Sequence, residues 1–155
     1  KYKDALDSYN KSIDINPYDA ATWNGKGMAL YALGDYDGAL DCYNKSAKAD
    51  PSNVDVWNNR GIVLLALSNY EMALESYNES LAINSIDKKA MNGKANALMN
   101  LERYEESLEQ ISKVIKIDST DAAAWNSKGL ILEKLGRYGE ANAAFSKSKG
   151  LGYSI

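Results

Sequence analysis

An asparagine recurs at one position of the chain every 34 residues, and its amide group offers the most distinctive chemistry of the sequence. These residues are Asn24, Asn58, Asn92 and Asn126. An amide side chain both donates and accepts hydrogen bonds, so a row of amides can pair with the backbone of an extended peptide without reading its sequence. A solvated polar face, or bonds to a neighbouring helix, would use the same residues. The spacing leaves these interpretations open.

The sequence offers little for catalysis or metal binding. It contains no histidine, which removes the commonest general base and the commonest transition-metal ligand. No phosphate-binding, dinucleotide-binding or nucleophile-elbow motif occurs. The single cysteine, Cys42, has no histidine or basic cluster beside it in sequence, so we expect a packed or half-exposed thiol and no nucleophile. We therefore expect no enzymatic activity, no cofactor and no metal.

The overall charge and hydropathy narrow the range of partners. The net charge is −3 and no basic stripe is visible, which argues against nucleic-acid binding. No stretch of 18 or more apolar residues suggests a membrane span. One cysteine cannot form an internal disulfide, which fits a reducing compartment. We expect a cytoplasmic protein that binds neither nucleic acid nor membranes.

The elements that must position the asparagines follow from the same 34-residue period, which no insertion or deletion interrupts. The repeated positions are Trp23, Trp57, Met91 and Trp125; Gly27, Gly61, Ala95 and Gly129; Leu30, Leu64, Leu98 and Leu132; and Tyr2, Tyr36, Tyr70, Tyr104 and Tyr138. Steps of three and four residues predict an amphipathic helix that starts in each unit before the tryptophan position. A small residue such as Ala39, with a large one such as Tyr43 four residues later, indicates a second helix in each unit.

Residues at the helix ends support this division into two helices per unit. The first helices begin after good N-cap types, namely Asp19, Asn53, Asp87 and Asp121. Their ends are marked by Gly34 and Gly136 in two units, with Ser68 and Glu102 at the same position in the others. The second helices stop near Pro17 and Pro51, because proline cannot continue a helix.

These residues together resemble the tetratricopeptide repeat, which has a tryptophan, a glycine four residues later, a small-to-aromatic pair and a terminal proline. The resemblance implies an all-α fold: a right-handed α-solenoid of antiparallel helix pairs, with nine helices. It divides the chain into 1–19, the second helix of a truncated repeat, three full repeats over 20–53, 54–87 and 88–121, and a last repeat with a C-terminal tail over 122–155.

The resemblance also places the asparagine face along the concave groove, where partners of this family usually bind. Apolar residues share that face, which is typical of an adaptable binding surface, although close packing between successive first helices would use them too. We predict a peptide-binding groove lined by Asn24, Asn58, Asn92, Asn126, Met28, Tyr31, Ile62, Leu65, Asn96, Met99 and Leu130. The family's clamp for a C-terminal carboxylate needs a lysine where Asn24 stands, so we do not expect that clamp.

We therefore predict a non-enzymatic scaffold that binds a protein, as a peptide or a helix, in the groove. The alternative is a structural spacer or self-association segment of a longer repeat array. The first predicted helix has no partner ahead of it and should expose Leu6, Tyr9 and Ile13, while no capping helix follows Phe145. We accordingly expect end-to-end association of neighbouring molecules.

Overall fold

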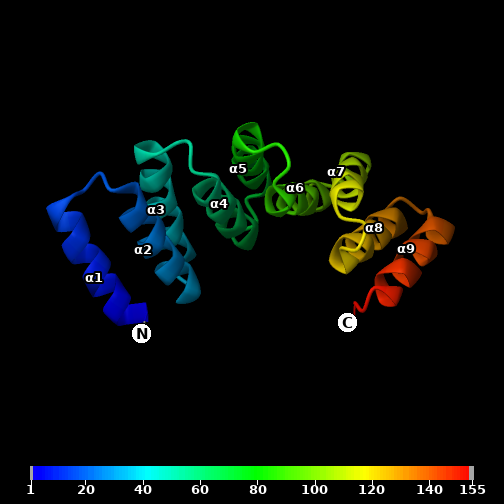
Figure 1. Ribbon diagram of the computed structural model, residues 1–155, viewed down its shortest axis with the longest axis horizontal. Coiled ribbons are helices and arrows are strands. Elements are labelled where there is room, and N and C mark those ends of the chain that lie inside the picture. Colours follow the sequence, from blue (N-terminus) through cyan, green and yellow to red (C-terminus); the bar gives the residue numbers. More distant parts are fainter. Residues whose placement is uncertain (1, 154–155) are drawn as a thin grey trace. The chain divides into compact units, whose positions relative to one another are not determined.

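The computed structural model describes residues 2–153, which form nine α-helices and no strand (Figure 1). The helices are α1 (Tyr2–Ile15), α2 (Ala20–Ala32), α3 (Tyr36–Ala49), α4 (Val54–Ala66), α5 (Tyr70–Ile83), α6 (Lys88–Asn100), α7 (Tyr104–Ile117), α8 (Ala122–Lys134) and α9 (Tyr138–Gly150). The predicted all-α class and the predicted number of helices are confirmed. No helix in this part of the chain is both long and apolar enough to cross a membrane.

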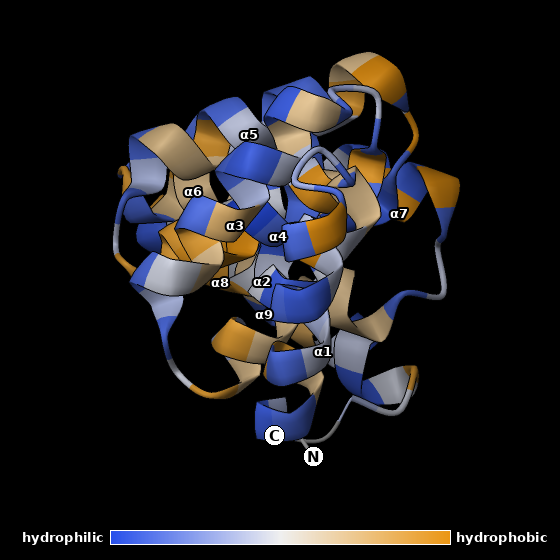
Figure 2. Cartoon of the chain, turned by 90° about the vertical axis from the view of Figure 1, so that its left-hand side faces the viewer, coloured by the Kyte–Doolittle hydropathy of each residue, from blue (hydrophilic) through white to orange (hydrophobic). Residues whose placement is uncertain are grey.

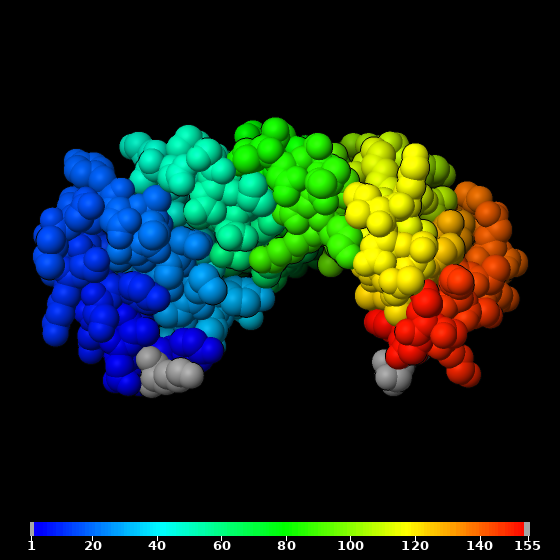
Figure 3. Space-filling view, viewed as in Figure 1, coloured from blue at the N-terminus to red at the C-terminus, as the bar shows by residue number. Residues whose placement is uncertain are grey.

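The helices form two compact units, Lys1–Ser85 and Ile86–Ile155. In the first unit α2 packs against α3 and α4 against α5, with further contacts of α1 on α2 and of α3 on α4. In the second unit α6 packs against α7, α7 against α8, and α8 against α9. Figure 3 shows that side chains fill the space between neighbouring helices of a unit. Each helix therefore gains its stability from its neighbours, since about 14 residues of isolated helix are marginal in water.

Each first helix begins at the predicted N-cap residue. Asp19 accepts from the backbone N–H of Ala21, and Asn53 accepts from two N–H groups of the first turn. Asp87 and Asp121 do the same at α6 and α8. These side chains satisfy N–H groups that have no partner within the helix, so the predicted starts of the first helices are confirmed.

Each first helix is followed, two residues after its last residue, by a residue with the left-handed backbone conformation. Gly34 and Gly136 adopt φ values of 81° and 71°, and Ser68 and Glu102 adopt 57° and 58°. The next residue then donates its N–H to the carbonyl five positions earlier, as Arg103 does to Leu98 at 2.9 Å. This closure satisfies the last carbonyls of the helix and turns the chain into the second helix. The sequence marks all four positions, but two of them carry side chains that make this backbone conformation costly.

The two helices of a hairpin approach most closely where a glycine faces an aromatic ring. A Cβ atom added at the glycine would lie 2.4 to 2.7 Å from the ring in three pairs: Gly27 with Tyr43, Gly61 with Tyr77, and Gly129 with Phe145. The third hairpin has Ala95 and Ile111 at these positions, so a larger residue on one helix accompanies a smaller one on the other. Tyr77 is only 1% exposed. The amphipathic character of the helices is visible as alternating hydrophobic and hydrophilic residues in Figure 2.

Replacing Gly61 with alanine should therefore destabilise the protein by about 1–3 kcal/mol, because the new methyl group would overlap the Tyr77 ring. Tyr77→Ile alone should also destabilise it, by leaving a cavity. The double variant reproduces the pair found in the third hairpin, so we expect it to lose less stability than the sum of the two single variants. Urea unfolding of the four proteins measures this coupling. Strict additivity would contradict the proposed contact.

Replacing Glu102 with glycine should stabilise the protein by about 0.5–1 kcal/mol, because glycine adopts a φ of 58° without a steric penalty. Thermal unfolding monitored by circular dichroism provides the measurement. Asn100→Gly, two residues earlier and inside α6, is the matched control and should be destabilising. A lower melting temperature for Glu102→Gly would mean that the left-handed turn is wrong.

Candidate functional site

An apolar hollow of about 450 Å³ lies in the first unit. Its walls come from α1, α2 and α4, with Tyr43 of α3 between them. Met28 and Tyr31 of α2 and Ile62 of α4 line it, and all three belong to the predicted groove. We call this surface the Met28 hollow. It brings predicted apolar site residues of two successive first helices into one concave surface.

The most prominent side chains of the Met28 hollow are open to solvent. Met28 is 54% exposed and Tyr31 is 37% exposed, while Ile62 is half-buried. The ring of Tyr31 packs against that of Tyr36, with 5.4 Å between the centroids. A flexible thioether beside a supported aromatic ring is a combination that adapts well to the side chains of a partner.

Residues of α1 form one wall of the hollow, which sequence reasoning missed. Tyr2, Ala5 and Tyr9 line it together with Gly25 of α2. A Cβ atom at Gly25 would lie 2.7 Å from the Tyr9 ring, so this glycine permits Tyr9 to lie against α2. The sequence signal for this contact is weak, because the position of Gly25 holds Asn59 in the next repeat but glycine again, as Gly93, in the one after.

The asparagines of the first unit do not form the accessible row that the sequence predicts. The amide of Asn59 donates to Oδ1 of Asn24 at 3.1 Å, so Asn24 takes part in a bond between α2 and α4. Asn58 is only 1% exposed, which corrects its predicted place in the groove: the side chain is buried and cannot line an accessible surface. A period of 34 residues fixes which positions are equivalent, but not how closely each one is covered.

The other predicted groove residues are distributed over both units. Leu65 of α4 is half-buried. In the second unit Leu130 is 42% exposed, and Asn96 is exposed, with its Oδ1 accepting from Asn100 at 2.7 Å. The half-buried members of the second unit are Asn92, Met99 and Asn126. The Met28 hollow itself is built from the first unit alone.

No part of residues 2–153 gathers three or more histidine, cysteine or acidic side chains in a way that could hold a metal ion. Cys42 is buried at 2% exposure, and this burial raises the pKa of its thiol. A raised pKa disfavours the reactive thiolate at neutral pH. Of the two alternatives left open by the sequence, a packed or a half-exposed thiol, the structure shows the packed one.

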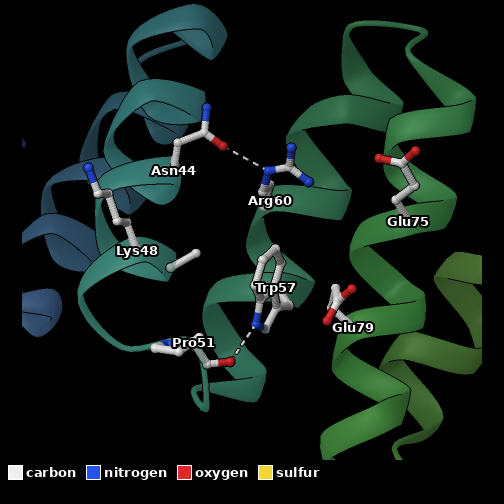
Figure 4. A pocket seen from close by; sticks show the side chains of 8 residues that line it. Asn44, Lys48, Pro51, Trp57, Arg60, Glu75 and Glu79 are labelled. Atoms are coloured by element: carbon white, nitrogen blue, oxygen red, sulfur yellow. Dashed lines mark hydrogen bonds between the residues drawn. The ribbon is translucent and has the colours of Figure 1, made fainter.

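A second hollow, of about 560 Å³, lies beside Trp57 in the first unit (Figure 4). Trp57 and Arg60 of α4 lie between a wall from α3, with Asn44 and Lys48, and a wall from α5, with Glu75 and Glu79 (Figure 4). We call it the Trp57 pocket. It combines an aromatic ring with charged groups of both signs.

Each tryptophan of the chain is fixed by its indole N–H. Trp57 Nε1 donates to the carbonyl of Pro51 at 2.8 Å, and Trp23 makes the same bond to Pro17 at 2.8 Å. Trp125 donates to Ser119 at 3.0 Å. The indole thus holds the turn that leads into its own helix, so these half-buried rings position the connection between hairpins as well as packing in them.

A basic residue three positions after each tryptophan lies over its ring. The charged group is 5.5 Å from the ring centroid for Lys26 on Trp23, 5.8 Å for Arg60 on Trp57 and 5.2 Å for Lys128 on Trp125. Such contacts stabilise modestly at partly exposed sites. The basic residues therefore contribute to the scaffold, while their charged ends reach the surface.

Comparison with protein-family models finds four matches along the chain. Models described as tetratricopeptide repeat match residues 8–41, 54–86 and 92–152, and a further model described as TPR repeat matches residues 27–68. Together they cover most of the chain. A search of curated proteins finds no match.

Similar solved structures carry the same architecture. A structure of MamA 41-end from Desulfovibrio magneticus RS-1 is 23% identical, with a TM-score of 0.92, and the match covers 97% of this chain and 85% of that one. YrrB, described as a TPR protein with an unusual peptide-binding site, is 23% identical, with a TM-score of 0.87 and coverage of 97% and 78%. The first TPR of Spaghetti (RPAP3), bound to the HSP90 peptide SRMEEVD, is 28% identical, with a TM-score of 0.73 and coverage of 76% and 93%. These likenesses confirm the predicted solenoid class of the fold.

Proposed function

Because the chain belongs to the tetratricopeptide repeat family, we propose that it is a protein-interaction scaffold that binds a peptide or a helix in the Met28 hollow. The observation that carries this proposal is the hollow itself, with the exposed side chains of Met28 and Tyr31 on it. Exposed apolar side chains that gather in one concavity are typical of interaction sites.

The similar solved structures support a peptide as the class of ligand. The RPAP3 domain is bound to a peptide in its structure, and the description of YrrB names a peptide-binding site. The ligand chemistry of the Met28 hollow differs from that of a carboxylate clamp, because its lining is largely apolar and, among residues 2–153, includes no lysine or arginine. We therefore propose that an apolar side chain of the partner enters the hollow, and that polar groups such as Asn59 contact the partner's backbone.

The alternative function is self-association through the first helix. No residue of α1 is buried, and Tyr2 is 50% exposed. In this alternative a second copy of the chain covers the wall that α1 contributes to the hollow. Sedimentation over a range of concentrations separates the two proposals, because self-association increases the sedimentation coefficient with concentration and peptide binding by a monomer does not.

Replacing Met28 with glutamate should weaken binding of a peptide identified on an array of 15-residue peptides by about 10- to 100-fold, because the charge would have to be buried against an apolar partner. The melting temperature should stay nearly unchanged, since Met28 is more than half exposed. Met72→Glu is the matched control, because Met72 is 39% exposed on a second helix, outside the hollow. Equal losses in both variants, or undiminished binding by Met28→Glu, would contradict the proposed site.

A further inference from the structure

The first hairpin contains a cation site that is occupied by a residue of the chain itself. The ammonium group of Lys45 lies 4.5 Å from the centroid of the Trp23 ring and contacts Oδ2 of Asp41 at 2.7 Å. Lys26 lies over the same ring at 5.5 Å. An aromatic face and a carboxylate together are a favourable site for an organic cation.

The second hairpin has the same arrangement, except that a carboxylate replaces the ammonium group of Lys45. Thirty-four residues after Trp23, Lys26 and Asp41 stand Trp57, Arg60 and Glu75. The position of Lys45 is taken by Glu79. The aromatic ring, the neighbouring base and the carboxylate are thus all present, while the built-in ammonium group is replaced by a second carboxylate.

In the Trp57 pocket the position that corresponds to Lys45 is held by Glu79, one of the residues that line it. It encloses about 560 Å³, and Figure 4 shows Glu79 beside the Trp57 ring and Glu75 farther along the same wall. Both ring and base are held in place, because Trp57 bonds to Pro51 and Arg60 donates to Asn44 at 2.8 Å and to Ser76 at 2.6 Å. A fixed ring beside two exposed carboxylates needs little reorganisation to accept a cation.

We propose that the Trp57 pocket binds a lysine or arginine side chain of a partner protein. The partner's charged group would lie on the Trp57 ring as the ammonium group of Lys45 lies on the Trp23 ring. The partner's charged group would stack on the indole and contact the carboxylates of Glu75 and Glu79. This site is separate from the Met28 hollow and does not depend on the function proposed for it.

The distribution of charge within the pocket favours a cation on the α5 side. The negative groups are both on α5, whereas Lys48 lies on the opposite wall and Arg60 is already engaged with Asn44 and Ser76 (Figure 4). An anion near Trp57 would meet Glu79 directly. A partner's acidic residue could instead pair with Lys48, so the pocket also fixes the direction of a peptide that carries both charges.

The last hairpin provides a matched control within the same chain. Trp125 and Lys128 correspond to Trp57 and Arg60, and they line a hollow of about 360 Å³. Here Ala143 replaces the first carboxylate and Lys147 the second. One carboxylate, Glu140, also lines this hollow, but it pairs with Arg137 at 2.7 Å. The two lysines in this hollow should therefore disfavour a cation.

The test is a titration of the 155-residue chain with Nα-acetyl-lysine amide, followed by the indole N–H resonances of the three tryptophans. We expect a saturable shift of Trp57 with a Kd on the order of 10 mM, which weakens with salt, and little shift of Trp125. The neutral isostere Nα-acetyl-norleucine amide and the anionic Nα-acetyl-glutamate amide should not produce it. A Trp57 shift that norleucine or glutamate amide reproduces, or no saturable shift at all, would overturn the proposal.

Two variants separate the proposed contacts from general changes in the fold. Glu79→Lys restores the arrangement of the first hairpin. The introduced ammonium group should occupy the cation site on the Trp57 ring and reduce binding of Nα-acetyl-lysine amide by more than about 10-fold. Glu79→Gln removes only the charge and should weaken binding by about 3-fold. Glu79 is exposed on α5, so unchanged melting temperatures are expected for both variants. Undiminished binding of Nα-acetyl-lysine amide by Glu79→Lys would exclude the proposed cation site on the Trp57 ring.

Discussion

The close contact between a glycine on one helix and an aromatic ring on the next sets the geometry on which the other features of the first, second and last hairpins depend. Tyr77 can lie against α4 only because Gly61 has no side chain, and this approach brings the faces of α4 and α5 together. The ring fills the space that the glycine leaves, so the two residues form one packing element. The distance between the two helices then determines which neighbouring side chains are buried in the core and which lie on the surface.

The third hairpin shows that this constraint has a second solution. Ala95 and Ile111 replace the glycine and the aromatic ring, and Ser107 donates to the carbonyl of Ala95 at 2.7 Å. The hairpin also has an ion pair at its open end, where Lys88 Nζ contacts Asp118 at 2.7 Å. That contact lowers the pKa of Asp118 to about 2. The pair therefore stays charged until the pH falls well below neutral, and it joins the start of α6 to the end of α7.

Much of the fold could be predicted from the sequence, because period and end signals are local properties. The first helices begin where residues such as Asp19 predict, and they end where Gly34 and its equivalents stand. The accessible surface was harder to predict, since exposure depends on neighbours that the period does not describe. Asn58 shares its repeat position with Asn24, yet Asn24 bonds across to α4 whereas Asn58 is covered. The contribution of α1 to the Met28 hollow likewise depends on Gly25, at a repeat position that holds Asn59, Gly93 and Ser127 in the later units.

Departures from the repeat are therefore where function is to be sought in such a chain. Residues that recur in every unit serve the packing of every hairpin. They therefore explain the stability of the fold more readily than the recognition of a partner. Glu79 departs from the lysine that the other units carry at its position, and it reverses the charge beside Trp57. The position of Gly25 varies among glycine, asparagine and serine, and the glycine lets the Tyr9 ring lie against α2. These differences underlie the cationic and the apolar ligand proposed above. The two surfaces are lined by different helices, since α1 and α2 line most of one and α3 and α5 flank the other, with α4 contributing to both. A single unit of this scaffold thus offers two chemically distinct contacts, so that a partner able to reach both would be selected by an apolar residue and by a basic one.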